Sequence, residues 1–298
     1  MTELAPIVLF TYKRLDTLQQ TVHALANNSL ADKSDLIIYS DGAKKLEDEP
    51  IIQEIRNYLK TVTGFKSVTI HESPINKGLA TSIINGVSEV MAMYKKAIVL
   101  EDDLITSTNF LEYMNQALNY YQDNPRILSV SGYSPIIKGL NPNEIYYTQR
   151  ASSWGWACWE DRWQKIDWQA QSYESFVKDS QAKSRFNQMG SDMCLMMKRQ
   201  MQGKINSWAI RFCFHQFQND LYSVHPSISK IQNIGFSEKN ATNTVQKYNR
   251  FQSEFDKSNS LAFNFNTVIQ LDKRLIQQFV RDNSIKMRIL NKVLNYIQ

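Results

Sequence analysis

Three consecutive carboxylates, Glu101, Asp102 and Asp103, follow directly on the apolar run 97–100. Like charges this close repel strongly in a low-dielectric surrounding, so a cation has to offset them. Mg²⁺ and Mn²⁺ prefer oxygen ligands and commonly complete their shell with water or substrate phosphates. The run therefore predicts a site for a divalent metal, Mn²⁺ or Mg²⁺, and a diphosphate. Alternatively, the acids only cap a helix that begins near Ser107, where carboxylates are also favoured.

The elements that must position these acids follow from the hydrophobic pattern. We expect strands at residues 6–12, 35–40, 67–71, 97–100 and 127–131. Between them, apolar residues recur at helical spacing in segments 15–25, 51–59, 79–90 and 110–118. This alternation predicts an α/β fold with a mainly parallel sheet flanked by helices.

Polar residues follow three further predicted strands, at the edge where ligands bind in open parallel sheets. They are Thr11, Tyr12, Lys13 and Arg14 at the end of the first strand, Asp41 and Gly42 after the second, and Asn76, Lys77 and Gly78 after the third. Each of the last two groups is equally typical of a simple turn. Glycine-rich phosphate loops are absent from the sequence, so Arg14 and Lys77 become candidates for binding phosphate.

Domain organisation changes near residue 135. We expect an alternating α/β half at 1–135 and an irregular, aromatic-rich half of the same domain at 136–271. Residues 272–298 are predicted to form a separate amphipathic helix. Six basic residues against two acidic ones give this segment a charge of +4, out of +5 for the chain. It could lie on anionic lipid, dock on the domain or pair in a dimer, and nucleic-acid binding is not expected because one terminal stripe carries the charge.

Composition indicates a globular protein, because 43% hydrophobic residues among 298 can form a sizeable core. Cys158, Cys194 and Cys213 are odd in number and widely spaced, which is typical of free thiols in a reducing compartment. With neither a signal peptide nor an apolar membrane-spanning run in view, we expect a cytoplasmic protein.

Several segments resemble the GT-A glycosyltransferases. Residues 98–133 are similar to the N-acetylglucosaminyltransferase I type, and bacterial family 2-like sugar transferases of capsule and O-antigen clusters are more similar still. The later segments that carry the likeness are Ser153-Trp154-Gly155-Trp156-Ala157, Asn206-Ser207-Trp208-Ala209-Ile210-Arg211 and Asn233-Ile234-Gly235-Phe236. The resemblance covers residues 5–245. It implies that residues 1–135 are the nucleotide-sugar-binding half and residues 136–271 the acceptor-side half of one catalytic domain.

The resemblance implies a metal-dependent, inverting transfer of a sugar from a nucleoside diphosphate sugar, most simply a UDP-sugar, to a glycan or lipid-linked glycan acceptor. It makes Asp103 the metal ligand, turns Glu101 and Asp102 toward ribose or donor sugar, and makes Arg14 and Asp41 nucleotide contacts. Residues matching the sugar-pocket segments are Trp154, Gly155, Trp156 and Arg211. The tryptophans would equally suit an aromatic core.

The catalytic base is the weak point of this likeness. Asn206 stands where relatives commonly have Asp, and an amide cannot accept the acceptor's proton. Asp192 is our first candidate, with Glu160 and Asp161 in reserve, although each also suits an ion-paired helix acid.

Two other functions fit parts of the pattern. A sugar-nucleotide-binding protein without turnover would explain Asn206. A nucleotidyltransferase would also need carboxylate-bound metal, but it typically has a glycine-rich, arginine-containing loop where this chain has residues 11–15.

Overall fold

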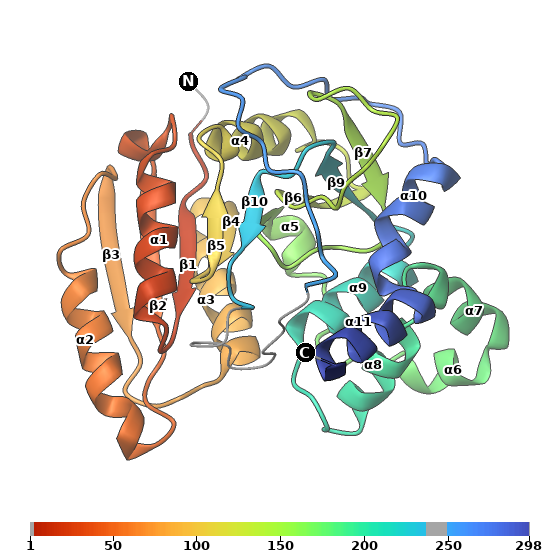
Figure 1. Cartoon of the computed structure of the whole chain (residues 1–298), viewed down its shortest axis with the longest axis horizontal. Coiled ribbons are helices and arrows are strands. Elements are labelled where there is room, and N and C mark those ends of the chain that lie inside the picture. Colours follow the sequence, from red (N-terminus) through yellow and green to blue (C-terminus); the bar gives the residue numbers. More distant parts are fainter. Residues whose placement is uncertain (1–2, 237–248, 298) are drawn as a thin grey trace.

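A computed structural model describes residues 3–236 and 249–297. Within these residues the chain forms an eight-stranded sheet in the order β3-β2-β1-β4-β8-β6-β9-β7 and a two-stranded ribbon of β5 and β10 (Figure 1). The strands are β1 (Ile7–Thr11), β2 (Asp35–Ser40), β3 (Ser67–Glu72), β4 (Lys96–Glu101), β5 (Leu104–Thr106), β6 (Ile127–Ser131), β7 (Ile145–Thr148), β8 (Trp156–Trp159), β9 (Tyr222–Pro226) and β10 (Ile231–Asn233).

The first four strands of the sheet are parallel, and each of the five predicted strands is present within two residues of its expected ends. Every residue of β1 and β6 is buried, as strands in a sheet covered on both faces should be. The predicted helices are also confirmed as α1 (Leu15–Ala26), α2 (Glu49–Leu59), α3 (Leu79–Tyr94) and α4 (Phe110–Tyr120).

Helices cover both faces of the sheet. On one face, α1, α2 and α4 bury residues such as Leu18, Ile55 and Met114 against the strands. On the other face, α3, α5 (Glu160–Trp163) and α9 (Trp208–Gln218) contribute Val87, Trp163 and other apolar side chains. The expected α/β fold with a mostly parallel sheet between helices is therefore confirmed.

Strand order creates a crevice between β1 and β4. The chain runs from β1 outward through β2 to β3 and then returns to β4 on the other side of β1. Crossovers on either side of β1 leave an opening at the carboxyl ends of β1 and β4, which is where open α/β sheets bind ligands.

The half after residue 135 joins the same sheet through strands that the sequence did not reveal. Strand β8 runs antiparallel to β4 and β6, and β7 runs antiparallel to β9. A separate helical layer of α6 (Tyr173–Lys178), α7 (Ser180–Gln188) and α8 (Met193–Met201) packs with α9 around Phe186, at the side of the molecule away from β3 (Figure 1). Short strands of three to five residues give too little alternation to be recognised.

The C-terminal segment differs from the single helix we expected. It forms α10 (Lys273–Val280), a 3₁₀ turn at Arg281–Asn283 and α11 (Ile285–Ile297). The break arises because Ser284 has an extended backbone and its neighbours Asp282 and Asn283 are buried. None of the described helices is both long and apolar enough to cross a membrane.

Residues 249–271 run as an extended segment across α4 before reaching α10 (Figure 1). A buried ion pair of Lys230 and Asp256 holds the segment, and Asn109 Nδ2 also donates to Asp256 over 3.0 Å. Further along, Tyr121 and Tyr147 hydroxyls donate to the Asn266 carbonyl. This segment thus positions the C-terminal helices.

We predict that Asp256→Ala lowers the free energy of unfolding by about 3–5 kcal/mol, because Lys230 would then be a buried and unpaired charge. Urea unfolding followed by circular dichroism measures the change. A Lys230→Met/Asp256→Leu double variant should recover most of the loss, and a double variant no more stable than the single one would contradict this role.

Candidate active site

A cleft of about 1000 Å³ opens at the carboxyl ends of β1, β2 and β4. From the first half of the chain it is lined by the acids Glu101, Asp102 and Asp103, by Thr11, Tyr12, Arg14, Asp41, Asn76 and Gly78, and by Lys44, Lys45 and Asp48. From the second half come Ser153, Trp154, Asn206, Ser207, Trp208, Asn233, Gly235 and Phe236. Most strand-end residues singled out from the sequence therefore meet in one place.

Arg14 binds the two aspartates at the end of β4. Its Nη2 lies 2.5 Å from Asp102 Oδ1 and its Nη1 lies 2.8 Å from Asp103 Oδ2. The other Asp102 oxygen accepts from Thr11 Oγ1 at 2.9 Å and from the Tyr12 backbone N–H at 3.1 Å. Thr11 at the end of β1 and residues directly after it thus stabilise Asp102 from both sides, while Asp103 lines the cleft.

Charge crowding persists at this strand end despite Arg14. Burial, followed by the charges of Asp103 and Asp102, raises the pKa of Glu101 to about 8. Burial also raises the pKa of Asp103, against the attraction of Arg14. Among the described residues no three His, Cys, Asp or Glu side chains converge in a metal-binding arrangement. Asp103 with Glu101 or Asp102 offers hard oxygen ligands that suit Mg²⁺ or Mn²⁺ if water or substrate completes the shell.

Asp41 organises the neighbouring loop. Its Oδ1 accepts the backbone N–H groups of Gly42 and Lys77, and its Oδ2 accepts that of Gly78 at 2.9 Å. Asn76 Nδ2 donates to the Gly42 carbonyl. The predicted groups after β2 and β3 are therefore joined, but the Lys77 side chain is exposed and does not line the cleft.

The β5–β10 ribbon brings the later half of the chain onto Asp103. Ile234 donates its backbone N–H to the Asp103 carbonyl over 2.9 Å. A Cβ on Gly235 would lie 2.0 Å from Asp103 Oδ2, so only glycine fits beside this carboxylate. The resemblance had marked segment 233–236, but its contact with Asp103 depends on strand β5, which we did not predict.

A scan against family models matches residues 7–186 to glycosyl transferase family 2. The match covers more than half of the chain. This protein belongs to glycosyl transferase family 2. Its sheet and flanking helices form the Rossmann-like GT-A fold that the sequence led us to expect.

No curated protein matches this family member. Among solved structures, it is similar to the mannosyltransferase PcManGT from Pyrobaculum calidifontis in complex with GDP-Man and Mn²⁺, at 10% identity and a TM-score of 0.39. That likeness covers 56% of this chain and 48% of the other. TarS of S. aureus is similar at 11% identity and a TM-score of 0.29, over 46% of this chain and 22% of TarS. The chain thus spans about half or less of these proteins, and such weak likenesses say nothing about its substrates.

Of the sugar-pocket residues expected from the resemblance, Trp154 lies in the cleft and the others do not. Trp156 is buried in β8, where it stacks on Trp163 and Trp208 as part of the core. Gly155 has a φ of +59° and lies against the Ile231 side chain, so it shapes the turn into β8. Arg211 holds the N-terminus of α9 through bonds to Ser207, Trp168 and Asn206.

The reserve candidates for the base lie far from the family 2 cleft. Strand β8 is antiparallel to β4, with Trp159 opposite Lys96 at the beginning of β4. Glu160 pairs there with Lys95 over 2.8 Å, and Asp161 is exposed beside Arg162. Since β4 is six residues long, these acids are separated from Glu101 by about 16 Å along the strand. The direction of β8, invisible in the sequence, places them at the opposite edge.

Asp192 is also outside the cleft lining. It precedes α8, and its two oxygens accept from Arg150 Nη1 and Nη2 at 2.8 and 3.0 Å. Burial acts to raise the pKa of Asp192, but the charge and hydrogen bonds of Arg150 outweigh it and lower the pKa. This geometry favours a structural ion pair over a base.

Two features of the cleft escaped sequence reasoning. Lys44 and Lys45 line it beside Asp41, and they were visible only as an adjacent basic pair after a turn. Tyr12 and Lys13 both bind Asp48, at 2.8 and 3.1 Å, which ties the segment after β1 to the loop before α2. Asp48 carries no motif that would have marked it.

We predict that stability of the wild type in EDTA falls as the pH rises from about 4.5 to about 8. Folded Glu101 keeps its proton up to a pKa of about 8, whereas the unfolded carboxyl releases it near 4.5. Between these values the folded state binds more protons, so each rise in pH favours unfolding. Denaturant unfolding between pH 5 and pH 8 should show a smaller fall for Glu101→Gln. The exposed Glu174→Gln serves as control, and parallel pH curves for all three proteins would contradict the prediction.

Proposed function

We propose that this family 2 protein transfers a sugar from a nucleoside diphosphate sugar, most simply a UDP-sugar, to an acceptor hydroxyl with the help of a divalent metal. The observation that carries the proposal is the three-carboxylate end of β4 at the β1–β4 crevice, with Arg14 between two of the acids and Lys44 and Lys45 on the same cleft. Acids that bind a cation and lysines that attract phosphate oxygens together suit a metal diphosphate.

Each group has a specific task in this proposal. Asp103 is the metal ligand, with Glu101 and Asp102 beside it. A bound Mn²⁺ or Mg²⁺ would supply stabilisation of the charge on the leaving diphosphate. Arg14 and Thr11 hold Asp102 in place, Asp41 fixes the loop that carries Asn76 and Gly78, and Trp154 offers a ring for the apolar face of a sugar.

The acceptor is proposed to be a glycan, free or lipid-linked, of the capsule or O-antigen type, and the transfer to be inverting by in-line displacement. The acids that would hold the metal suit donor activation, while Asn206 in the cleft can hydrogen-bond an acceptor hydroxyl but cannot take its proton. A protein that binds sugar nucleotides without turnover is therefore the main competing function.

We predict that one donor among UDP-, GDP- and dTDP-sugars releases nucleoside diphosphate with Mn²⁺ and not with EDTA. Asp103→Asn should reduce the rate by about 100-fold or more, as loss of a charge-stabilising group does. Asp192→Asn should lower the melting temperature and keep most of the turnover, because its carboxylate binds Arg150.

Coupled detection of the released diphosphate measures these rates with acceptor glycans supplied. Metal-dependent binding of a donor without release would favour the non-catalytic function. Release of pyrophosphate from a sugar phosphate and a nucleoside triphosphate would identify a nucleotidyltransferase instead.

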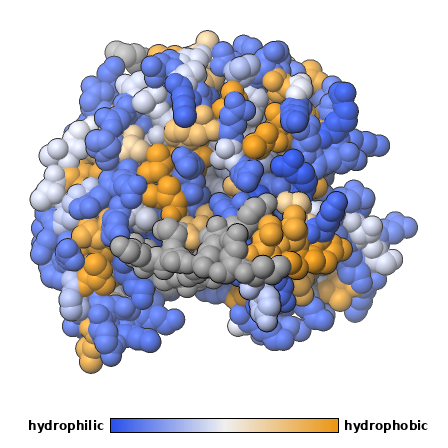
Figure 2. Space-filling model, in the orientation of Figure 1, coloured by the Kyte–Doolittle hydropathy of each residue, from blue (hydrophilic) through white to orange (hydrophobic). Residues whose placement is uncertain are grey.

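We also propose that α11 contacts an anionic membrane surface. Ile285, Ile289, Val293 and Tyr296 are 64%, 59%, 45% and 91% exposed and recur at spacings of four, four and three, so they form one apolar face. Exposed Lys286 and Lys292 flank that face on its two sides. Figure 2 shows hydrophobic surface where the C-terminal helices lie. Charge favours a lipid partner over a second copy, whose own lysines would meet these.

Vesicle co-sedimentation tests this contact. The wild type should bind phosphatidylglycerol vesicles and not phosphatidylcholine vesicles. Lys286→Glu/Lys292→Glu should weaken binding by roughly 30-fold, since each basic residue near the surface contributes ~1 kcal/mol. Lys33→Glu/Lys60→Glu, in the first half of the chain, is the matched control. Dimerisation without vesicle binding would contradict the lipid partner.

A further inference from the structure

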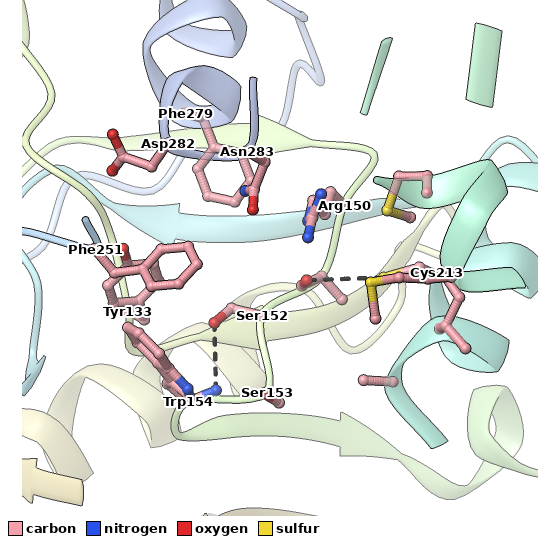
Figure 3. A pocket seen from close by; sticks show the side chains of 15 residues that line it. Tyr133, Arg150, Ser152, Ser153, Trp154, Cys213, Phe251, Phe279, Asp282 and Asn283 are labelled. Carbon is pink, nitrogen blue, oxygen red and sulfur yellow. Dashed lines mark hydrogen bonds between the residues drawn. The ribbon is translucent and has the colours of Figure 1, made fainter. Parts of the chain in front are cut away.

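A second cavity, of about 230 Å³, lies beside the cleft (Figure 3). Figure 3 shows Phe279 and Asn283 along one side, Ser152 and Trp154 along the opposite side, and Arg150 toward one end. Three residues, Ser153, Trp154 and Ala209, line both this cavity and the cleft. A ligand here would therefore be a neighbour of a donor bound at the acids.

Aromatic rings form much of the cavity wall. Tyr133 and Trp154 meet edge to face with ring centroids 4.6 Å apart, and Trp154 and Phe251 meet in the same way at 5.5 Å. Phe279 is fixed by an edge contact with the buried His225. Rigid aromatic walls of this kind suit the C–H faces of a pyranose ring.

A buried carboxylate of this cavity has an unused oxygen. The Asp282 side chain is 3% exposed, and its Oδ1 accepts from Arg281 Nε over 3.2 Å. Its Oδ2 is buried without a hydrogen-bond partner among residues 3–236 and 249–297. Burial raises the pKa of this carboxyl. A buried oxygen with no donor is a place for a ligand hydroxyl.

The charged side chains Arg150 and Asp282 of this cavity already have ion-pair partners, which favours a neutral ligand. Arg150, the basic side chain at one end, already donates to both Asp192 oxygens and to the Met189 carbonyl. Asp282, already paired with Arg281, offers its second oxygen as a hydrogen-bond acceptor, which a sugar hydroxyl can satisfy and a fully ionised phosphate cannot. With Asn283 and Ser152 as further polar groups, the lining can exchange hydrogen bonds with hydroxyls.

We infer that this cavity binds one neutral sugar residue of the acceptor, with a hydroxyl donating to Asp282 Oδ2 and the ring against Trp154 and Phe251. This inference rests on the proposed function. The volume lies below the ~300–1,000 Å³ of pockets for drug-sized ligands, so it suits a single sugar and excludes a nucleotide. Phe251, Phe279 and Asp282 lie outside residues 7–186 matched by the family model, so this chain's C-terminal segment completes a site whose other wall, with Tyr133 and Trp154, lies within the matched residues.

Saturation-transfer NMR on the full chain tests the site with four probes, the methyl glycosides of glucose, galactose, mannose and N-acetylglucosamine. At least one should bind in the absence of nucleotide, and Asp282→Asn should weaken it by about tenfold or more. Asp220→Asn, at an exposed carboxylate, is the matched control and should bind as the wild type does. Binding of none of the probes, or equal binding by Asp282→Asn, overturns the inference.

Two further measurements separate this site from the donor site. Asp282→Asn should raise KM for the acceptor and leave the affinity for UDP with Mn²⁺ unchanged. Asp103→Asn should weaken the affinity for UDP with Mn²⁺ and leave KM for the acceptor unchanged. Sugar binding without donor turnover would contradict only the proposed function. Turnover with an unchanged acceptor KM in Asp282→Asn would contradict only the sugar site. Should Asp282→Asn fail to fold, Asn283→Ala and Phe279→Leu carry the same expectation, and unchanged sugar binding in both variants overturns it.

Discussion

Repulsion among Glu101, Asp102 and Asp103 is the constraint on which the rest of this site depends. The acids end a buried strand, so water cannot screen them fully, and their neighbours must supply the compensating charge. Arg14, three residues after β1, supplies that charge, and Thr11, the last residue of β1, donates a hydrogen bond to Asp102. The parallel pairing of β1 with β4 is therefore what makes a stable acidic site possible, and a change that shifts this register would separate the acids from their partners.

The second half of the chain depends on the same acids through close packing. Ribbon β5–β10 starts from Asp103, and Gly235 fits there because a larger residue would collide with the carboxylate. The next link is the Lys230–Asp256 pair, which holds segment 249–271 and so places α10 and its 3₁₀ turn. Residues of the second half of the chain, distant in sequence from β4, are positioned by a chain of contacts that begins at the metal-binding candidates.

The parts of the structure that the sequence could predict are the elements that leave a periodic pattern of hydrophobic residues. Parallel buried strands and amphipathic helices leave clear periodicities, so five strands, four helices and the shared edge of the acids were predictable. The direction of a strand and the choice of its neighbours in the sheet leave no such periodicity. Glu160 was a reserve candidate for the catalytic base, but the antiparallel direction of β8 places it at the opposite edge of the sheet. Asp192 was the first candidate, but Arg150, 42 positions away, binds both of its oxygens. The expected C-terminal helix failed for a related reason, because burial of Asp282 and Asn283 outweighs the helical period that continues across them.

The two cavities offer different kinds of interaction to a ligand, and so they select ligands on different grounds. The cleft is dominated by charge, with acids and lysines that suit any nucleoside diphosphate and its cation. The second cavity is dominated by aromatic rings and a single unused carboxylate oxygen, which discriminate shape and hydroxyl position. Because the two share only Ser153, Trp154 and Ala209 among the described residues, substitutions in segment 249–283 could change the sugar that fits without disturbing Arg14 or the acids. On the proposed assignment, donor chemistry is fixed by the sheet, and acceptor choice is set by a C-terminal segment that the sheet only anchors.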